Sequence, residues 1–322
     1  MKNIAIITGG DSAEYSISLQ SAQTVRNNLP HYIKSYMVHV KGEHWDVLID
    51  QQYVPVNKNN FSFLQNGMPI QFDAVFMALH GPPAENGIIQ HYFDALNIPY
   101  TCCSAAISAL TFDKHKCNNQ LNACGYTCAT SFLLSEGDAI DEEKIITKVG
   151  LPCFVKPNAS GSSYGVSKVT IQNELNKAIS TAFVHDKQVL IEQFIDGIEV
   201  SCGVYTDGNN TQTLPITEIV SENDFFDYEA KYEGKSKEIT PARITDRLTK
   251  NIQQTTQAIY NQMGLEGICR IDYIIMNDIP YIIEINTIPG LSDESIIPKQ
   301  ISTAELTLSK IFEICLLNSM NK

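Results

Sequence analysis

Two neighbouring apolar runs near the end of the chain constrain its fold more than any other feature. They cover residues 268–276 and 281–286, and a turn-like Asn-Asp-Ile-Pro stretch separates them. β-Branched and aromatic residues dominate both runs, which predicts a β-hairpin. We expect residues 277–279 to form a three-residue connection, so that Met276 pairs with Pro280, which is tolerated as the first residue of a strand.

Charged side chains lie inside this hairpin. Side chains alternate faces along a strand, so the set expected to share one face is Arg270, Asp272, Ile274, Ile282, Glu284 and Asn286. Asp272 then lies opposite Glu284, where like charges roughly 4.5–5.5 Å apart at Cβ destabilise a sheet. A divalent cation would offset this repulsion, because carboxylate and amide oxygens are ligands that suit Mg²⁺. Arg270, opposite Asn286, would offer a planar fork to phosphate.

Two other interpretations of the hairpin remain open. Arg270 would neutralise both acids in a purely structural ion-pair network, without any metal. A register slip by one residue would instead place Asp272 and Glu284 on opposite faces of the sheet.

Composition narrows the class of protein. The 322 residues suffice for two or three domains. A formal net charge of −13 and the lack of a basic run make nucleic acid an unexpected partner. No apolar run approaches the ~20 residues of a membrane helix, and the N-terminal MKNIAIITGG predicts a strand rather than a signal peptide. The nine cysteines have neither paired nor zinc-site spacing, so we expect reduced thiols and a cytoplasmic protein.

The chain opens with a strand, a Gly-rich loop and a helix, which is typical of a doubly wound parallel α/β unit. The expected elements are strands at 4–8, 35–40, 74–79 and 99–102 and helices at 16–28 and 88–96. The loop lacks GxGxxG, so no dinucleotide fingerprint is present. Ligands bind outside the carboxyl ends of strands in such sheets, and Glu14 and residues 80–87 lie there. At this place the His80 side chain either supports the fold or takes part in the function of the site.

A second region carries a loop rich in Gly and Ser at residues 158–165. The elements expected around it are helices at 111–124, 140–149 and 172–184 and strands at 127–134, 152–157, 166–170 and 188–195. Exposed N–H groups with Ser162 and Ser163 would cradle phosphate oxygens, and Lys156 would add a positive charge. A strand follows the loop, so it is not a Walker P-loop. A flexible hairpin without a ligand is the alternative.

A third region runs from residue 196 to the end of the chain. Segment 221–240 is polar and aromatic without an apolar period, and such irregular segments are often functional lids. We expect a helix at 246–263 before the hairpin, an irregular loop at 287–295 after it, and a closing helix at 304–317.

These stretches together resemble the ATP-grasp ligases, and within them the D-alanine–D-alanine ligases. The resemblance covers nearly the whole chain and rests, in order, on GGDSAEYSISL, HGPPAENG, KPNASGSSYGV, LIEQFIDGIEV, FDYEAKY, CRIDY and EINTIPGLSDES. It implies a three-domain ATP-grasp architecture: an N-terminal doubly wound parallel-sheet α/β domain at 1–103, and two α+β domains at 104–195 and 196–322 that clasp ATP.

The activity implied by the resemblance is ATP-dependent ligation of two D-alanine molecules through a D-alanyl phosphate, for peptidoglycan precursor synthesis, by a cytoplasmic homodimer. ATP would be bound by Lys114, Lys156, Ser163, Glu192, Phe194, Ile195, Glu199 and Lys231. Two Mg²⁺ ions, or Mn²⁺, would be held by Asp272, Glu284 and Asn286. The amino acids and the reaction would involve Glu14, His80, Ser162, Tyr232, Arg270, Gly290, Ser295 and Ile296.

Within that last set, the resemblance implies separate tasks. Glu14 would bind the ammonium of the first D-alanine, and Ser162 and Tyr232 would connect to it when the lid closes. Ser295, with Ile296, would bind the carboxylate of the second D-alanine, while Arg270 and the Gly290 N–H would stabilise the oxyanion. Four residues depart from the usual family pattern: Ala84 replaces Gly, Asn86 replaces Asp, Ser160 replaces an acid and Phe226 replaces Tyr.

Other functions are weighed against this one. They are another ATP-grasp carboxylate–amine ligase, a D-alanine–D-lactate ligase, and a nucleotide-binding module without catalysis. Tyr232 favours the dipeptide, because the depsipeptide-forming relatives lack this residue. The intact set of Arg270, Asp272, Glu284 and Asn286 argues against a module without catalysis.

Overall fold

A mixed sheet occupies the N-terminal part of the chain. The computed structural model describes residues 2–161, 164–221 and 236–321. The strand order is β4–β3–β2–β1–β7, with β1 at Asn3–Gly9, β2 at Lys34–Lys41, β3 at His44–Ile49, β4 at Gln52–Pro55 and β7 at Ala74–Met77. β1 pairs in parallel with β2 and β7, as predicted, and β3 and β4 add antiparallel strands that were not predicted. β1 is buried on both faces, as expected for a central strand with a continuous apolar run.

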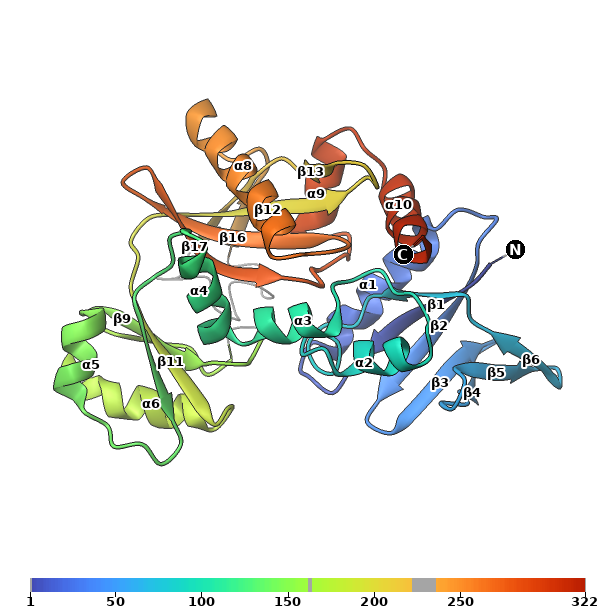
Figure 1. Ribbon diagram of the computed structural model, residues 1–322, viewed down its shortest axis with the longest axis horizontal. Coiled ribbons are helices and arrows are strands. Elements are labelled where there is room, and N and C mark those ends of the chain that lie inside the picture. The colour runs from blue at the N-terminus through green and yellow to red at the C-terminus, as the bar shows by residue number, and fades with distance from the viewer. Residues whose placement is uncertain (1, 162–163, 222–235, 322) are drawn as a thin grey trace.

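Helices cover both faces of this sheet (Figure 1). α1 (Tyr15–Asn28) and the last helix, α10 (Leu308–Met320), share one core with β1 and β7. α2 (Ile88–Ala95) and the hairpin of β5 (Ser62–Gln65) and β6 (Met68–Gln71) pack on the other face. The strand predicted at 99–102 is wrong, because only a single bridge joins Tyr100 to Val75.

Two short helices lead into the second sheet. The helix predicted at 111–124 begins instead at Lys114, because Asp113 ends α3 (Ala105–Phe112) and caps α4 (Lys114–Ala123) with its carboxylate. The sheet has the order β10–β9–β11–β8. Its strands are β8 at Ser131–Ser135, β9 at Cys153–Pro157, β10 at Ser167–Val169 and β11 at Gln188–Gln193. α5 (Glu142–Val149) and α6 (Leu175–Phe183), the latter preceded by a 3₁₀ turn at Gln172–Glu174, share its core.

The third sheet carries the predicted hairpin at one edge. Its order is β15–β14–β12–β16–β17, with β13 paired to β12. The strands are β12 at Ile198–Thr206, β13 at Thr211–Thr213, β14 at Thr217–Ser221, β15 at Ser236–Ile239, β16 at Cys269–Met276 and β17 at Ile279–Asn286. α8 (Asp246–Gln262) covers one face. α9 (Ile296–Thr303) was not predicted, and the closing helix begins at Leu308 rather than at residue 304.

The charged residues of the hairpin pair as predicted, although its turn and its regularity differ from the prediction. Its turn has two residues, Asn277 and Asp278, both with positive φ, so Met276 pairs with Ile279 and not with Pro280 as predicted. A β-bulge then adds one residue to β17 beyond Tyr273. The two differences cancel, and Asp272 lies opposite Glu284 and Arg270 opposite Asn286.

One assignment of a side chain to a face is wrong for the same reason. Ile282 lies opposite Tyr273, not on the face of Glu284, because the bulge reverses the alternation along β17. Both side chains are buried in the core beneath α8. The charged face is therefore confined to the far end of the hairpin, next to the loop that follows β17.

Candidate active site

A bidentate ion pair lies at the centre of the charged face. Arg270 donates from Nε to Asp272 Oδ1 at 2.8 Å and from Nη2 to Asp272 Oδ2 at 2.7 Å. Ser201, opposite Asp272 on β12, donates its hydroxyl to Oδ1 at 2.6 Å. Burial alone would lower the pKa of the Arg270 guanidinium, but Asp272 together with the charges of Glu284 and Glu238 outweighs it and raises that pKa above its ordinary value. Arg270 therefore remains a permanent cation in this place.

The donor set fits a hard divalent cation. Asn286 Nδ2 lies 3.0 Å from Asp272 Oδ2 and 3.4 Å from Glu284 Oε1, so one side-chain amide spans the two acids. The two carboxylates lie on directly opposed residues of β16 and β17. Half a turn of the Asn286 amide would present its oxygen to the same space. Three oxygen-bearing side chains then converge, which is the chemistry that Mg²⁺ prefers.

A second ion pair joins two neighbouring strands of the second sheet. Lys156 on β9 pairs with Glu192 on β11, and Asn118 Nδ2 donates to the other oxygen of that carboxylate at 2.8 Å. The Lys156 and Glu192 side chains are 12% and 9% exposed, so this pair is largely withdrawn from water. Phe194, directly after β11, places its ring 5.7 Å from that of Phe154 and 4.3 Å from Lys168 Nζ.

The start of α4 contacts the loop rich in Gly and Ser. Lys114 donates its backbone N–H to Asn158 O at 3.2 Å and its ammonium to Ser160 O at 2.5 Å. Asn158 is buried and receives the His115 N–H on its side-chain oxygen. Two cationic side chains, Lys114 and Lys156, thus lie next to the start of loop 158–165, which the sequence predicts to bind phosphate.

Glu14 joins the N-terminal sheet to this loop. A Cβ built on Gly81 would lie 3.3 Å from Glu14 Oε2, and one built on Gly161 would lie 3.1 Å from the same atom. The carboxylate therefore lies between two loops that are distant in sequence. Nearby Glu85 is a group that the sequence argument missed: burial and the Glu14 charge raise its pKa to about 8, and the charges of Glu284 and Lys114 also reach it.

His80 is held inside the protein. It is 4% exposed, with Nδ1 2.9 Å from Ile288 O and Nε2 2.8 Å from Ser21 Oγ. A carbonyl oxygen can only accept, so Nδ1 carries the proton and Nε2 accepts from Ser21. Burial lowers the pKa of His80, which agrees with this neutral form. Ser21 Oγ in turn accepts the Leu291 N–H at 3.1 Å, so α1 positions the loop after β17 through two side chains.

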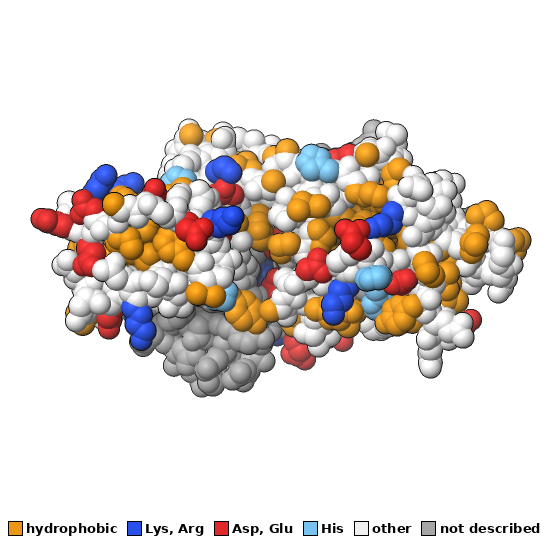
Figure 2. Space-filling view, turned by 90° about the horizontal axis from the view of Figure 1, so that it is seen from below, with side chains coloured by type: hydrophobic (Ala, Val, Ile, Leu, Met, Phe, Trp, Pro, Cys, Tyr) orange, Lys and Arg blue, Asp and Glu red, His pale blue; other side chains and the backbone are white. Residues whose placement is uncertain are grey.

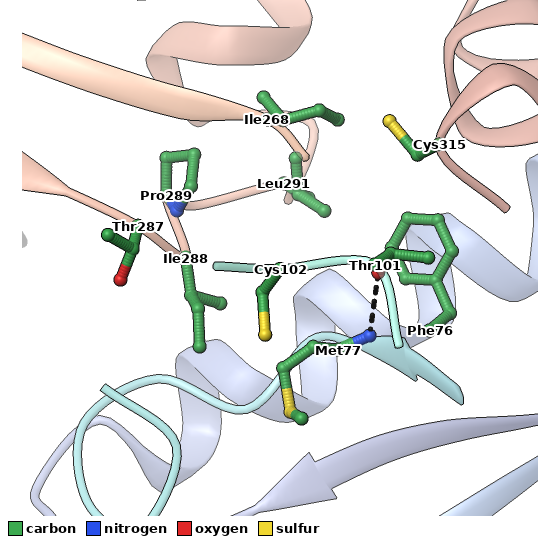
Figure 3. A pocket seen from close by; sticks show the side chains of 10 residues that line it. All are labelled: Phe76, Met77, Thr101, Cys102, Ile268, Thr287, Ile288, Pro289, Leu291 and Cys315. Atoms are coloured by element: carbon green, nitrogen blue, oxygen red, sulfur yellow. Dashed lines mark hydrogen bonds between the residues drawn. The ribbon is translucent and has the colours of Figure 1, made fainter. Parts of the chain in front are cut away.

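The loop after β17 brings Gly290 and Ser295 together. A Cβ on Gly290 would lie 2.6 Å from Ser295 Oγ, so only glycine fits without a shift. Ser295 is the N-cap of α9, its side chain does not cap the helix, and Ser292 Oγ lies 2.7 Å away. Behind the loop, Ile288 and Leu291 line a small apolar pocket that is closed from below by residues of β7 and of the 101–102 segment (Figure 3).

Several predicted site residues cannot be placed. Ser162, Ser163, Lys231, Tyr232 and Phe226 lie outside the described residues. The remaining departures from the family pattern fit their surroundings. Ala84 is not among the residues with positive φ, and Asn86 Oδ1 accepts the Ile88 N–H at the start of α2. Ser160 meets Lys114 through its backbone oxygen, which any residue would supply.

Acidic and basic side chains alternate with apolar ones over the face in Figure 2, and no broad basic surface gathers there. Within the part of the chain that the structure describes, no helix combines the length and apolar character needed to cross a bilayer.

Comparison with known proteins agrees with this arrangement. Family models of the D-alanine–D-alanine ligase N-terminus and C-terminus match residues 3–103 and 121–316. A D-alanine–D-alanine ligase of Flavobacterium johnsoniae is 47% identical over 315 residues, which cover 97% of each chain. One from Phocaeicola vulgatus is 44% identical over 313 residues, which cover 96% of this chain and 97% of that protein.

Solved structures of similar proteins superpose over nearly the whole chain. D-alanyl-alanine synthetase A of Vibrio cholerae gives a TM-score of 0.89 at 26% identity and covers 100% of this chain and 99% of its own. The VanG D-Ala:D-Ser ligase of Enterococcus faecalis gives 0.86 at 30% identity, with 99% of both chains covered. The predicted three-domain α/β architecture is thereby confirmed. The chain belongs to the D-alanine–D-alanine ligase family and has the ATP-grasp fold.

Proposed function

We propose that this chain is a D-alanine–D-alanine ligase, which joins two D-alanine molecules at the expense of ATP through a D-alanyl phosphate and so supplies a peptidoglycan precursor. The observation that carries the proposal is the opposed pair of acids Asp272 and Glu284 beside Arg270, with Glu14 nearby: the charges of Glu14 and Glu284 both act on Glu85. A phosphate-binding centre with an ammonium-binding carboxylate near it suits the activation of an amino acid.

The nucleotide would lie between the second and third sheets. The residues proposed to bind it are Lys114, Lys156, Ser163, Glu192, Phe194, Ile195, Glu199 and Lys231. Asp272, Glu284 and Asn286 are proposed to hold two Mg²⁺ ions, for which Mn²⁺ would substitute, and these ions would neutralise charge on the transferring phosphoryl group. Lys114 and Lys156 add fixed positive charge. The Lys156–Glu192 pair is largely buried, so little water reaches these two side chains.

The first D-alanine would bind through its ammonium to Glu14. His80 holds the loop after β17 by its bonds to Ser21 and Ile288, so we assign it to the substrate site as a positioning group rather than a direct contact. Ser162 and Tyr232 would complete the network over the substrate, and closure of the lid would keep water from the acyl phosphate.

The second D-alanine would place its carboxylate at Ser295 and Ile296, in the first turn of α9. Backbone N–H groups at a helix N-terminus favour an anion, and the Ser295 hydroxyl hydrogen-bonds Ser292 in the loop rather than capping its own helix. The oxyanion formed on attack would be stabilised by Arg270 and the Gly290 N–H. Losing one such donor typically costs ~10²–10³ in rate.

The proposal extends to the organisation of the protein. We propose domains at 1–103, 104–195 and 196–322, a homodimer formed through the N-terminal domain, and a cytoplasmic location. All nine cysteines are free thiols, which agrees with a reducing compartment. Neither nucleic acid nor membrane is a proposed partner.

The mass of the product tests the function. The purified protein is incubated with ATP, Mg²⁺ and D-alanine, and with L-alanine or no amino acid in parallel, while phosphate release and product mass are recorded. D-alanyl-D-alanine formed together with D-alanine-dependent phosphate release is the expected result. Phosphate release that does not depend on D-alanine would contradict the proposal, and a mixed product preferred when D-serine or D-lactate is added would assign the chain to another ligase.

A further inference from the structure

A buried glutamine on α9 contacts the strand next to the charged hairpin. Gln300 is 0% exposed and uses both ends of its carboxamide. Its Nε2 donates to Ser201 O at 2.9 Å and to Thr217 Oγ1 at 3.1 Å, and its Oε1 accepts the Gly203 N–H at 3.0 Å. A side-chain amide that satisfies one carbonyl and one N–H of the same strand behaves as a peptide group of a neighbouring strand would.

The carboxamide fills a gap in the pairing of β12. β14 reaches β12 only as far as the pair of Ser201 with Thr217, and β13 begins to pair at Val204. Cys202 and Gly203 lie between these two partners. Without Gln300, the Ser201 carbonyl and the Gly203 N–H would be left without these partners inside the protein, which is costly for a buried strand.

Gly203 makes this contact possible. A Cβ at residue 203 would lie 2.5 Å from Gln300 Oε1 and 2.7 Å from Ile297 Cδ1. Gly203 also lies opposite Arg270 in the sheet, two residues along the strand from Ser201. α9 therefore packs on the face of the sheet that carries the Arg270–Asp272 pair.

Ser201 connects the glutamine to the candidate metal ligand. Gln300 holds the Ser201 carbonyl, and the Ser201 hydroxyl donates to Asp272 Oδ1 at 2.6 Å. Outer groups of this kind orient a ligating carboxylate and commonly change metal affinity when they are lost. The same helix carries Ser295 and Ile296 at its start, five and four residues before the glutamine.

We propose that Gln300 is a positioning residue for this enzyme: it holds β12 so that Ser201 orients Asp272, and it ties the metal-binding strand to the helix that begins at the site of the second D-alanine. This inference rests on the proposed function, because it assigns Asp272 to the metal and Ser295 to the acceptor. It adds a physical link by which an occupied acceptor site and a correctly placed metal support one another.

The experiment compares Gln300→Met, which keeps the length of the side chain but loses all three hydrogen bonds, with Ser201→Ala and with the double variant. Gln253→Met is the matched control, because Gln253 also donates to a backbone oxygen of this region, Leu214 O, at 3.3 Å, but belongs to α8, which packs on the opposite face of the sheet from Asp272. Binding of Mn²⁺ in the presence of ADP is followed by the loss of the free Mn²⁺ paramagnetic resonance signal. Steady-state rates over Mg²⁺ and D-alanine are measured in parallel.

Gln300→Met is expected to weaken Mn²⁺ binding roughly three- to tenfold, the range for losing a net hydrogen bond or two. It should raise the half-saturating Mg²⁺ and the KM of the second D-alanine together, and leave the KM of the first within twofold. The double variant should bind Mn²⁺ little more weakly than Ser201→Ala alone, because both substitutions break the same link from Gln300 through Ser201 to Asp272. Gln253→Met should bind Mn²⁺ as the wild type does.

A variant that combines Gly203→Ala with Gln300→Ala separates a packing role of Gln300 from a positioning role. It refills the space without restoring the hydrogen bonds. If this pair recovers the melting temperature but still binds Mn²⁺ weakly, positioning is supported. If Mn²⁺ binding recovers together with stability, or if the Gln300→Met and Ser201→Ala effects add, the inference is wrong. A wild type that binds Mn²⁺ and ADP but makes no dipeptide would overturn the proposed function instead.

Discussion

Arg270 holds both carboxylate oxygens of Asp272 through two hydrogen bonds of 2.8 and 2.7 Å. Glu284, the other acid of the hairpin, is opposed to Asp272 but is not part of this bidentate pair. The two acids therefore have different duties. Asp272 is needed by the folded hairpin as well as by the proposed metal, while Glu284 can be neutralised without leaving a buried guanidinium without its counter-ion.

Neutralising each acid separately should distinguish the two duties. We expect Asp272→Asn to lower the free energy of unfolding by about 3 kcal/mol, because it breaks a buried pair on one side. Glu284→Gln should change stability little but lower kcat about 100-fold or more, the scale for lost electrostatic stabilisation. Urea unfolding and steady-state rates measure the two effects. Full activity in Glu284→Gln would leave the purely structural interpretation of the hairpin standing.

Nucleotide and metal should stabilise the protein only in combination. With ATP at 100 times its Kd, bound ligand adds about 2.7 kcal/mol to the free energy of unfolding. We expect most of this gain to vanish on addition of EDTA, because the carboxylates Asp272 and Glu284 repel the phosphates in the absence of a cation. Thermal unfolding with ATP, with and without Mg²⁺, checks this. An equal rise in Tm under both conditions would contradict the role assigned to the hairpin.

The Lys156–Glu192 pair should matter for nucleotide affinity. Lys156→Met removes the cation of this pair and leaves Glu192 with Asn118 as its described hydrogen-bond partner. We expect the Kd for ATP to rise about tenfold or more, with a loss of stability, because the remaining buried charge lacks its partner. Lys168→Met is the matched control, since its cation–π contact with Phe194 contributes only about 0.5–1 kcal/mol. Isothermal titration with ATP compares them.

The pH dependence of stability should reflect Glu85. Burial, followed by the Glu14 charge, raises the pKa of this carboxyl from 4.5 to about 8 in the folded protein. The folded state thus holds a proton that the unfolded chain releases between those values. The stability provided by the neutral carboxyl is fully present below about pH 4.5 and is lost as the pH rises to about 8.

Glu85→Gln should therefore flatten the fall in Tm between pH 5 and 8 in the protein without ligands. The difference in Tm between wild type and variant, measured across this range, isolates the contribution of one group. Glu143→Gln, a substitution at an exposed glutamate, serves as the control. Parallel profiles for wild type and Glu85→Gln would show that Glu85 is ionised throughout.

Close packing before β16 gives a prediction about the backbone. A Cβ on Gly267 would lie 1.9 Å from Thr101 O, whereas Gly264, with almost the same φ, has open space around it. Gly264→Ala should cost about 1–2 kcal/mol, the strain of a left-handed alanine. Gly267→Ala should cost clearly more, because the 101–102 segment must also move. Chemical unfolding of both variants tests this, and equal losses would mean that the contact is easily relieved.

The charged core of the site was predictable because its residues are close in sequence and obey a period of two. Asp272 and Glu284 could be paired from the pattern alone, although the predicted turn was one residue too long and the bulge was not predicted. A bulge leaves no mark in an apolar run such as YIIEIN. The correct pairing thus came from two errors that cancel.

Elements that depend on tertiary contacts were harder to predict. α9 reads IIPKQIST, and a proline with β-branched neighbours argues against a helix, yet Pro298 lies in the first turn, where its missing N–H costs nothing. Ser201, Ser21 and Gln300 each act on residues remote in sequence, and isolated polar residues in apolar runs give no sign of their partners. The roles of Ser162 and Tyr232 come from resemblance and remain predictions.

The last helix has a consequence for how the chain is made. Phe312 and Leu316 of α10 complete the same core as Ile4, Ile6 and Phe76 at the other end of the polypeptide. A ribosome that has released the first hundred residues has therefore produced a sheet with one side covered by α1 alone. That side is sealed only when translation has finished, so a truncated nascent chain should be a substrate for chaperones rather than a folded fragment.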